Sequence, residues 1–345
     1  MKKGLLLVNL GTPSEPTPEK VGVYLKQFLM DPQVVDIPWF LRWFFVYVLI
    51  VPKRAHKSAE AYQKVWTKRG SPLLFHTSDL TNAVREKVQG FEKVDFAMRY
   101  GEPSLESKLI EFQKTGIEEV TVVPLYPQYA LSSTQSTKDE IDRVAKKQNL
   151  SFRLKWIDDF YDDEGFTQAY AQKIRESVDL SKVDQLVMSF HGLPVRHLTK
   201  LGETKTHCYQ DPNCCEQITS VNRFCYRAQS FHTAKKIAQA LGLSDSQYKV
   251  TFQSRLGRTE WIKPYTDIYL DELAQGSTKN IAVVCPSFVA DCLETLEEIG
   301  IRAKQDFESK NKGTLYFIPC LNVDEKWISS LVSLIMENEK SGILI

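Results

Sequence analysis

A chain of 345 residues that is 43% hydrophobic is long enough for two domains, or for one large domain with a substantial core. Its 44 basic residues are balanced by 43 acidic ones, so the charge gives no reason to expect a nucleic-acid partner. The apolar start is broken by Asn9, Gly11 and Pro13, with no small-residue cleavage site after it, which favours a first strand over a signal peptide. Without export the compartment is reducing, so the seven cysteines are not expected to form a disulfide framework.

Strands and helices alternate along nearly the whole sequence. Short, mostly apolar stretches predict strands at 4–10, 94–99, 120–125, 152–157, 185–190, 248–253, 280–285 and 314–318. The segments between them predict helices at 17–30, 55–66, 77–88, 104–115, 137–147, 164–178, 230–241, 266–274, 291–299 and 327–338. This order predicts an α/β fold with parallel sheets flanked by helices, and the number of strands favours two sheets, one in each half.

Residues 37–51 are almost wholly apolar and rich in aromatic side chains. The stretch is shorter than the roughly 18 residues of a membrane span, and it contains Arg42. Two interpretations stay open. One is a buried helix; the other is an apolar lip that grips a greasy ligand or rests on a membrane surface, where Trp and Tyr are enriched.

Polar side chains gather where the predicted strands end, which is where open α/β sheets bind their ligands. His191 ends one strand, and Gly192 and Pro194 then force the chain out of the sheet. Near neutral pH an imidazole can take a proton or bind a metal, although an isolated histidine is about as often structural. Other strand ends carry Arg99, Tyr100, Tyr126, Gln253 to Arg255, and Pro286 to Phe288.

Acidic residues follow the last of these strand ends. Asp291, Glu294 and Glu298 are spaced to share one face of an α-helix, and Glu297 lies beside Glu294. Solvated surface and stabilisation of a helix start are the ordinary meanings of such residues. Because this helix directly follows a strand, we expect its carboxylates to line the same crevice as His191. A histidine, carboxylates, tyrosines and an arginine together suit a flat, partly charged ligand and a divalent metal.

Six motifs resemble those of the ferrochelatase family. They are NLGTP at 9–13, YPQY at 126–129, SFHGLP at 189–194, QSRLG at 253–257, Trp261 with PYTD at 264–267, and CPSFVADCLETL at 285–296. Each motif alone is weak, but together they run in the right order from residue 4 to about residue 300, and the set is very specific.

The resemblance implies two Rossmann-like domains with parallel sheets flanked by helices and a porphyrin cleft between them. It also implies insertion of ferrous iron into protoporphyrin IX to form protohaem, the terminal step of haem biosynthesis. We expect the first domain to span 1–134 with a returning C-terminal helix in 324–345, and to carry the lip at 37–51. The second is expected to span 135–323 and to carry the catalytic histidine, the acidic helix and the cysteine segment 208–225.

By the same resemblance, His191 and Glu294 are the catalytic pair, and the substrate iron meets His191, Glu294, Glu297 and Asp291. The implied porphyrin-binding residues are Leu10, Trp39, Arg54, Arg99, Tyr100, Tyr126 and Ser254. Many relatives have histidine where this chain has Cys292, so a role given to that histidine cannot be carried over. A neutral imidazole suits the two protons that a porphyrin must lose, and carboxylates can replace the water that iron sheds. Whether His191 takes protons, binds iron or does both stays open.

The choice of porphyrin depends on Leu10. In relatives that resemble this chain, a tyrosine at that position goes with coproporphyrin, and an apolar side chain goes with protoporphyrin. Leucine would leave an extra propionate poorly solvated, whereas a hydroxyl can meet it. The sequence therefore predicts protoporphyrin IX as the substrate.

Four cysteines crowd the segment after the His191 strand: Cys208, Cys214, Cys215 and Cys225. A Cys₄ set holds either zinc or a [2Fe–2S] cluster, and spacing alone does not choose between them. Neighbouring side chains tend to diverge, so fewer than four ligands stays an alternative. The segment resembles that of a bacterial ferrochelatase subgroup with an internal [2Fe–2S] cluster, which is the cofactor we expect. Cys285 and Cys320 are expected to be buried at strand ends.

A carrier or sensor that binds haem or porphyrin without metallating it is the main alternative, and a cobalt chelatase of related fold is another. The acidic row favours the enzyme, because a binding protein needs no acidic metal path. We expect a cytoplasmic protein that attaches peripherally to the membrane surface, on the inner face of the cell membrane. A homodimer is left open by the sequence.

Overall fold

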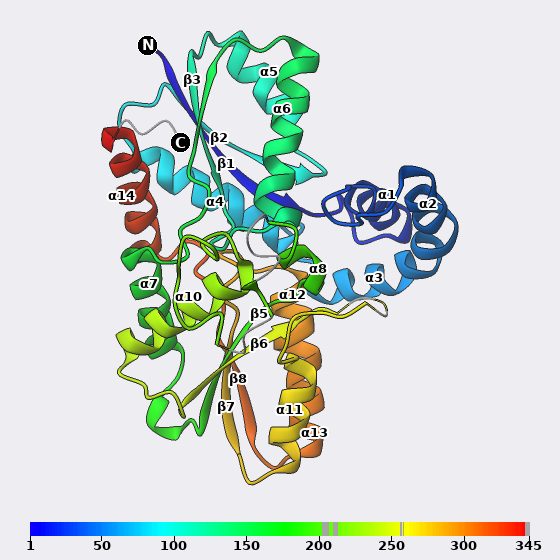
Figure 1. Cartoon of the computed structure of the whole chain (residues 1–345), viewed down its shortest axis with the longest axis vertical. Coiled ribbons are helices and arrows are strands. Elements are labelled where there is room, and N and C mark those ends of the chain that lie inside the picture. The colour runs from blue at the N-terminus through cyan, green and yellow to red at the C-terminus, as the bar shows by residue number, and fades with distance from the viewer. Residues whose placement is uncertain (202–206, 210–212, 256, 258, 342–345) are drawn as a thin grey trace. The chain divides into compact units, whose positions relative to one another are not determined.

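The structure, a computed structural model, describes residues 1–201, 207–209, 213–255, 257 and 259–341 (Figure 1). The strands are β1 (Lys3–Gly11), β2 (Lys93–Tyr100), β3 (Glu119–Pro124), β4 (Arg153–Trp156), β5 (Gln185–His191), β6 (Tyr248–Gln253), β7 (Asn280–Val284) and β8 (Thr314–Phe317). The α-helices are α1 (Pro18–Leu29), α2 (Trp39–Phe44), α3 (Val51–Val65), α4 (Pro72–Lys87), α5 (Leu105–Lys114), α6 (Ser136–Gln148), α7 (Glu164–Ser177), α8 (Val195–Leu198), α10 (Tyr226–Leu241), α11 (Thr266–Gln275), α12 (Leu293–Thr295), α13 (Lys304–Lys310) and α14 (Glu325–Ser341). Among the described residues, the π-helical segments are η1 (Phe45–Ile50), η2 (Leu131–Gln135) and η4 (Leu296–Ala303), and η3 (Leu180–Lys182) is a 3₁₀ turn.

The chain divides into two compact units. The first comprises 1–126, 131–159 and 331–345, and the second comprises 127–130 and 160–330. Each unit contains one four-stranded sheet in which every pair of neighbouring strands is parallel, with helices packed on it. The predicted class, two Rossmann-like α/β units, is therefore confirmed. Residues 135–159 lie in the first unit, whereas the sequence placed the boundary after 134, because β4 pairs with β3 and completes the first sheet.

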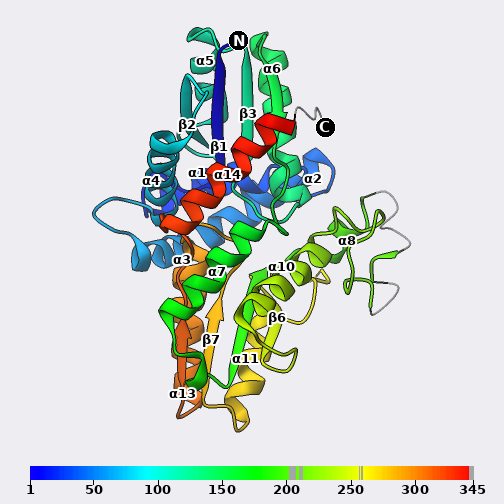
Figure 2. The same cartoon turned by 90° about the vertical axis from the view of Figure 1, so that its left-hand side faces the viewer.

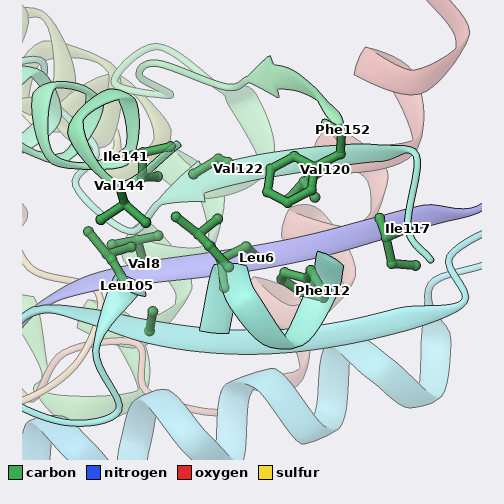
Figure 3. Packing of buried hydrophobic residues seen from close by; sticks show 12 residues of the cluster. Leu6, Val8, Leu105, Phe112, Ile117, Val120, Val122, Ile141, Val144 and Phe152 are labelled. Atoms are coloured by element: carbon green, nitrogen blue, oxygen red, sulfur yellow. The ribbon is translucent and has the colours of Figure 1, made fainter. Parts of the chain in front are cut away.

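The sheet of the first unit has the order β2-β1-β3-β4. Successive strand residues point to opposite faces, so Leu6 and Val8 lie on one face with α5 and α6, where Figure 3 shows them packed against Leu105, Phe112, Ile141 and Val144. On the other face the Asn9 side chain donates to the Thr77 hydroxyl of α4 at 3.1 Å. Thr121 donates to Glu339 of α14 at 2.8 Å on that same face. The core thus consists of a sheet with helices on both faces.

The sheet of the second unit has the order β6-β5-β7-β8. Val187 of β5 belongs to a core cluster with residues of α11, α13 and η4, which cover one face. Phe252 of β6 packs near Phe231 of α10 on the opposite face, and α7 runs beside α10 there (Figure 2). His191 has the same parity as Val187, so its side chain lies on the face covered by α11 and η4.

The two sheets have the same winding, since the second strand order repeats the first with every number raised by four. In each sheet the first strand in sequence lies between the second and the third. The connection that leaves the first strand and the connection that leaves the third therefore run to opposite sides of the sheet. Ligands of such sheets bind outside the carboxyl ends of the strands at this switch point. In the second unit the switch point lies between β5 and β7, where His191 ends β5.

Two of the differences between expected and observed elements lie next to the predicted site and the cysteine segment. The predicted helix 291–299 is a single α-turn, α12, followed by the π-helix η4, so Asp291 precedes the helix and the acidic residues do not share one α-helical face. The helix expected from 230 begins at Tyr226, directly after Cys225. No helix in the described ranges is long and apolar enough to cross a bilayer.

Candidate active site

His191 is held by three neighbours at the end of β5. Its backbone N–H donates to the Ser287 hydroxyl at 3.0 Å, and the Phe288 ring packs edge-on to the imidazole. Its Nδ1 lies 2.7 Å from the Gly192 carbonyl oxygen. A carbonyl only accepts, so Nδ1 carries the proton in the neutral ring and Nε2 keeps its lone pair. Among the described residues Nε2 has no hydrogen-bond partner, so it is available to a ligand.

The residue after the histidine has to be a glycine. The Gly192 N–H donates to the Gln253 carbonyl at 2.8 Å, which continues the pairing of β5 with β6 by one residue. A Cβ on Gly192 would lie 2.6 Å from that same carbonyl oxygen and 3.3 Å from the Trp261 ring. Any side chain would therefore push the two strands apart and displace His191.

Two carboxylates accompany the histidine. Glu298 of η4 interacts electrostatically with both His191 and Glu294. The Ser254 N–H donates to Glu298 at 3.0 Å, and the Ser254 hydroxyl donates to its other oxygen. Burial raises the pKa of Glu298, although the Ser254 hydrogen bond and the Arg302 and His191 charges oppose that rise. The π-helix thus brings Glu298, rather than Glu297, toward the histidine.

Gln253, the last residue of β6, connects the histidine strand to the acidic helix. Its side-chain amide donates to the Glu294 carbonyl at 2.8 Å and accepts from the Ser189 hydroxyl at 2.7 Å. Ser189 also contacts the Thr266 hydroxyl of α11 at 2.8 Å. These buried bonds fix Glu294 relative to β5. The QSRLG motif indicated this strand end through Ser254, but the sequence did not predict the role of Gln253. Leu256 and Arg258 lie outside the described residues.

The other two predicted iron residues make different contacts. Asp291 is buried, and its two oxygens accept hydrogen bonds from the Thr295 hydroxyl, the Cys320 N–H and the Asn322 amide. Asp291 therefore ties the start of α12 to the segment after β8. Glu297 is also buried, and its carboxylate lies 3.4 Å from the Arg302 guanidinium. Across the described ranges, no group of three or more His, Cys, Asp or Glu side chains is arranged around a single point that could hold a metal ion.

In the first unit, Arg99 and Tyr100 belong to a buried polar cluster. Both donate to one oxygen of Asp31, at 2.5 and 2.8 Å, and the Ser136 hydroxyl donates to the same oxygen at 2.6 Å. Arg99 also donates through Nε to Ser136 at 2.8 Å. Burial raises the pKa of Tyr100 well above its usual value. Tyr126, at the end of β3, is buried too, and burial raises the pKa of its phenol against the opposing effect of the Thr137 hydroxyl.

The remaining predicted porphyrin residues are more accessible. Leu10 is half-buried near the end of β1, and its N–H donates to the Asn9 side chain at 2.8 Å. Trp39 starts α2 with 65% of its surface exposed, and Arg54 is exposed on α3. The porphyrin contacts of these three residues, like those of Arg99, Tyr100, Tyr126 and Ser254, stay predictions.

Segment 37–51 exposes most of its apolar side chains and buries its one charge. Trp39, Phe40, Leu41, Trp43, Phe44, Phe45, Tyr47, Val48 and Leu49 are exposed. Arg42 is buried and donates to the carbonyls of Val35 and Ile37 at 3.0 and 3.3 Å. Val46 and Val51 anchor the segment in a small core with α1 and α3. The interpretation as a fully buried helix is therefore wrong, and the segment forms an exposed apolar surface, called the lip below.

The four cysteines of segment 208–225 are buried free thiols. The sulfurs of Cys214 and Cys215 lie 3.7 Å apart, so the adjacent pair converges. Cys208 and Cys225 are hydrogen-bonding neighbours, as are Cys215 and Cys225. The guanidinium of Arg227 donates to the Cys215 sulfur at 2.9 Å. A buried thiol set with a cation against one sulfur is chemically suited to a metal centre bound by thiolates.

Two similarly wound α/β units form a chelatase-like fold, and the second unit carries a histidine and carboxylates at its switch point. SirB from Bacillus subtilis with Fe3+ shares this fold at a TM-score of 0.58 and 12% identity, with 99% of this chain and 98% of that one covered. The family model described as Ferrochelatase matches residues 2–339. The ferrochelatase of Bdellovibrio bacteriovorus is 42% identical to this chain over 334 residues, which cover 97% of this chain and 98% of that protein. The ferrochelatase of Pseudomonas fluorescens is 44% identical over 332 residues, which cover 96% of both chains. The chain belongs to the ferrochelatase family and is an enzyme that inserts iron into a porphyrin.

Proposed function

We propose that the chain inserts ferrous iron into protoporphyrin IX with His191 as the proton acceptor and Glu294 and Glu298 beside it. The observation that carries this proposal is the single hydrogen bond of the imidazole: Nδ1 is committed to Gly192, and Nε2 keeps its lone pair. The reaction converts a porphyrin with two pyrrole N–H groups and Fe²⁺ into haem and two protons. A neutral imidazole accepts one proton at a time, and the carboxylates pass it on toward water.

The electrostatics of the site support this division of roles. Burial raises the pKa of Glu298, so this carboxylate takes up a proton more readily than a solvated one. Glu294 is half-buried, its backbone is fixed through Gln253, and its carboxylate neighbours the Cys292 thiol and Glu298. From this position the carboxylate would meet the iron as water leaves. Asp291 positions the start of α12 through its three hydrogen bonds. Glu297, whose carboxylate lies 3.4 Å from Arg302, would extend the acidic path.

The test is metal insertion by the purified protein. Protoporphyrin IX is supplied with Fe²⁺ under anaerobic conditions, or with Zn²⁺ as a readily observed substitute, and the change in porphyrin absorption is followed. Turnover supports the proposal. Stoichiometric porphyrin binding without turnover would instead support the carrier. A protein that inserts Co²⁺ into a more carboxylated macrocycle, and no metal into protoporphyrin IX, would support a cobalt chelatase.

Leu10 supports protoporphyrin IX as the porphyrin. Its half-buried side chain lies near the carboxyl end of β1, the edge at which such sheets bind ligands. Leu10→Tyr should raise kcat/KM for coproporphyrin III relative to protoporphyrin IX, because the hydroxyl gives an extra propionate a donor. Leu10→Ile is the matched control and should leave the ratio unchanged. Faster turnover of coproporphyrin III by the unaltered protein would refute the assignment.

The lip supports attachment to a membrane surface, on the inner face of the cell membrane. Its exposed aromatic side chains adjoin a basic stretch of α3 in which Lys53, Arg54 and Lys57 are exposed. Apolar rings beside lysine and arginine suit the interface of a bilayer that contains anionic lipid. The same exposed rings also suit contact with a flat, apolar porphyrin.

The lip is tested with Trp39→Ser combined with Phe40→Ser. Flotation with vesicles of phosphatidylcholine and phosphatidylglycerol should show lost binding, and the KM for porphyrin should rise. Val23→Ser, which removes another exposed apolar side chain of the same unit, is the control. A native dimer that the double variant turns into a monomer would show instead that a second copy covers the lip.

The cysteine segment supports a [2Fe–2S] cluster held by Cys208, Cys214, Cys215 and Cys225. Such a cluster has two irons with two thiolates each, so it needs pairs of sulfurs rather than three around one ion. The 3.7 Å separation of the Cys214 and Cys215 sulfurs is compatible with such a pair. When bound, the cluster would supply a one-electron redox centre and a covalent staple for this segment.

Absorption, iron and acid-labile sulfide assays on anaerobically purified protein test this assignment. Serine replacement of each cysteine in turn should remove the cluster and lower stability, while Cys320→Ser should retain it. Colourless native protein with stoichiometric zinc would overturn the assignment. Full cluster content in Cys215→Ser would show that the adjacent pair does not supply two ligands.

A further inference from the structure

The lip, segment 37–51, contains one charged residue, and that residue is buried. Arg42 is 7% exposed, whereas its chain neighbours Leu41 and Trp43 are exposed. Its Nη1 donates to the carbonyls of Val35 and Ile37 at 3.0 and 3.3 Å. The guanidinium is therefore turned against the stretch that leads into the lip, while the apolar residues beside it face solvent.

Stability does not explain the burial of this charge. The two hydrogen bonds of Arg42 go to neutral carbonyls rather than to a carboxylate, and among the described residues its buried Nε has no acceptor. A buried cation is costly unless it is paired and its donors are satisfied. A methionine could fill much of the same space without that cost. What the arginine provides, and an apolar side chain could not, is a fixed position for the two carbonyls.

The hydrogen bonds of Arg42 continue to the carboxyl end of β2. Val35, whose carbonyl accepts from Arg42, donates its own N–H to the Asp31 carbonyl at 2.9 Å. The buried Asp31 carboxylate in turn accepts from Arg99 and Tyr100, the last two residues of β2, at 2.5 and 2.8 Å. A continuous run of hydrogen bonds within the first unit therefore connects the strand end with α2, the helix at the start of the lip.

The apolar anchors of the lip act on a later part of it. Val46 and Val51 pack with α1 and α3, and both follow α2 in the chain. In α2, which the structure describes in full, Arg42 is the one buried residue. This helix is therefore attached to the rest of the unit through a polar contact, and Trp39 and Phe40 at its start are placed by that contact.

We propose that Arg42 is a positioning residue for porphyrin binding: its guanidinium holds α2 in register with the carboxyl end of β2 and so orders Trp39 and Phe40 for contact with the macrocycle. The proposal rests on the proposed role of the lip. Rings that are ordered before binding lose little conformational entropy when porphyrin arrives, which raises affinity. Without the Arg42 bonds the same rings are present, but porphyrin has to order them. Arg42 thus acts on porphyrin affinity and not on metal insertion.

The first experiment separates positioning from stability. Arg42→Met removes both hydrogen bonds and keeps an apolar stem. The KM for protoporphyrin, and its Kd from fluorescence quenching, should rise roughly 10-fold, with kcat for Zn²⁺ insertion nearly unchanged and the melting temperature equal or higher. Arg42→Lys keeps a donor that can reach one carbonyl and should restore part of the affinity. Arg143→Met, at an exposed arginine of the same unit, is the control and should behave as the unaltered protein.

Two outcomes would overturn the positioning role. One is an unchanged Kd for protoporphyrin in Arg42→Met. The other is a lowered melting temperature together with losses in both kcat and affinity, since a purely structural residue would act on all three.

The second experiment reads the order of α2 without any ligand. Its aromatic residues are cleavage sites for chymotrypsin, and a helix that opens locally is cut faster than one that is held in place. Limited digestion should cut within 39–44 several-fold faster in Arg42→Met than in the unaltered protein, while the other cuts keep their rates. Equal rates within 39–44 would show that Arg42 does not order the helix, and the proposal would fall.

The role of the lip and the role of Arg42 fail in different ways. If Trp39→Ser with Phe40→Ser leaves the Kd for protoporphyrin unchanged, the lip does not bind porphyrin, whatever the digestion of α2 shows. If that double variant raises the Kd but Arg42→Met does not, the lip stands and the positioning role falls. If Arg42 acts through these two rings, Arg42→Met should add little to the double variant, so the effects are not additive. An equal fold-change in both backgrounds would mean that Arg42 does not act through Trp39 and Phe40.

Discussion

The two units share one winding but use the ends of their strands differently. In the first unit, Arg99 and Tyr100 lie at the end of β2 and form a buried cluster with Asp31 and Ser136. Arg99, Tyr100 and Ser136 all donate hydrogen bonds to one oxygen of Asp31. In the second, the end of β5 presents a histidine whose Nε2 has no partner among the described residues. Both are strand ends of parallel sheets with the same order.

The difference shows that the fold provides the same sheet edge, at the carboxyl ends of the strands, in both units. The residues at that edge determine whether it is structural or reactive. A buried cluster in which Arg99, Tyr100 and Ser136 all donate to one oxygen of Asp31 rigidifies its surroundings. A histidine with one nitrogen committed and the other vacant is oriented and still reactive. We therefore assign architecture to the first set and reaction to the second, and each prediction below tests that division.

The largest effect is expected from His191→Ala. Metal insertion should fall by roughly 10³-fold, within the range that general acid–base groups contribute, while protoporphyrin binding measured by fluorescence quenching remains. His56→Ala, at an exposed histidine of the first unit, is the control and should retain full activity. Near-normal turnover in His191→Ala would show that the histidine takes no part in the mechanism. The strand end of the second unit would then be no more reactive than that of the first.

Glu294→Gln should cost about 10²-fold in kcat, because it removes charge at the site with little change of shape. The backbone carbonyl that accepts from Gln253 is unaffected by this substitution, so the fold should stay intact. Glu325→Gln, at the start of α14, is a control with the same chemical change. Equal activity of the two variants would show that Glu294 does not act on the iron or its protons.

Asp31→Asn should act on stability before activity. The substitution leaves the largely buried Arg99 guanidinium without its anion, and breaking such a pair costs roughly 3 kcal/mol in the free energy of unfolding. Urea denaturation measures this loss. Asp79→Asn breaks the exposed pair with Arg69 and should have a far smaller effect. A fully stable Asp31→Asn protein with impaired turnover would mean that the first unit's cluster takes part in the reaction.

The strands and the histidine were accessible from the sequence because their signals are local. The apolar run before His191 and the glycine after it predict a buried strand end, and the structure confirms both. The Asp31 cluster was not accessible, since Asp31 lies 68 residues from Arg99 in the chain and 105 from Ser136, and no local pattern encodes such pairing.

Glu298 shows a different limit. Spacing by 3.6 residues per turn is the right rule for an α-helix, but η4 is a π-helix with a wider turn, which changes the faces on which Glu297 and Glu298 lie. Ser254, which holds Glu298, has a φ of 66°, an uncommon conformation for a residue other than glycine. Ser254 and Glu298 are 44 residues apart in the chain and meet only through their hydrogen bonds in the folded protein, so no short sequence window could have predicted this pair.

The smallest expected effect is on how stability depends on pH. It should have opposite signs in the two units. Burial raises the pKa of Glu298, so the native state holds that proton more tightly than the unfolded chain does. Its contribution to stability is full below the unfolded pKa, near 4.5, and is lost as pH rises through the folded pKa. Glu298→Gln does not titrate, so its melting temperature should improve relative to the unaltered protein as pH rises above 4.5.

Glu339 of the first unit should show the opposite sign. Burial alone would raise the pKa of Glu339, but hydrogen bonds from Lys3 and Thr121 and the charge of Lys155 lower it overall. Its stabilisation is therefore present above the unfolded pKa and is lost as pH falls through the folded one. Glu339→Gln should lose stability relative to the unaltered protein near pH 7 and recover toward pH 4. Calorimetric melting at matched pH values measures both differences, and curves of equal slope for the two variants would contradict the division between a reactive and a structural carboxylate.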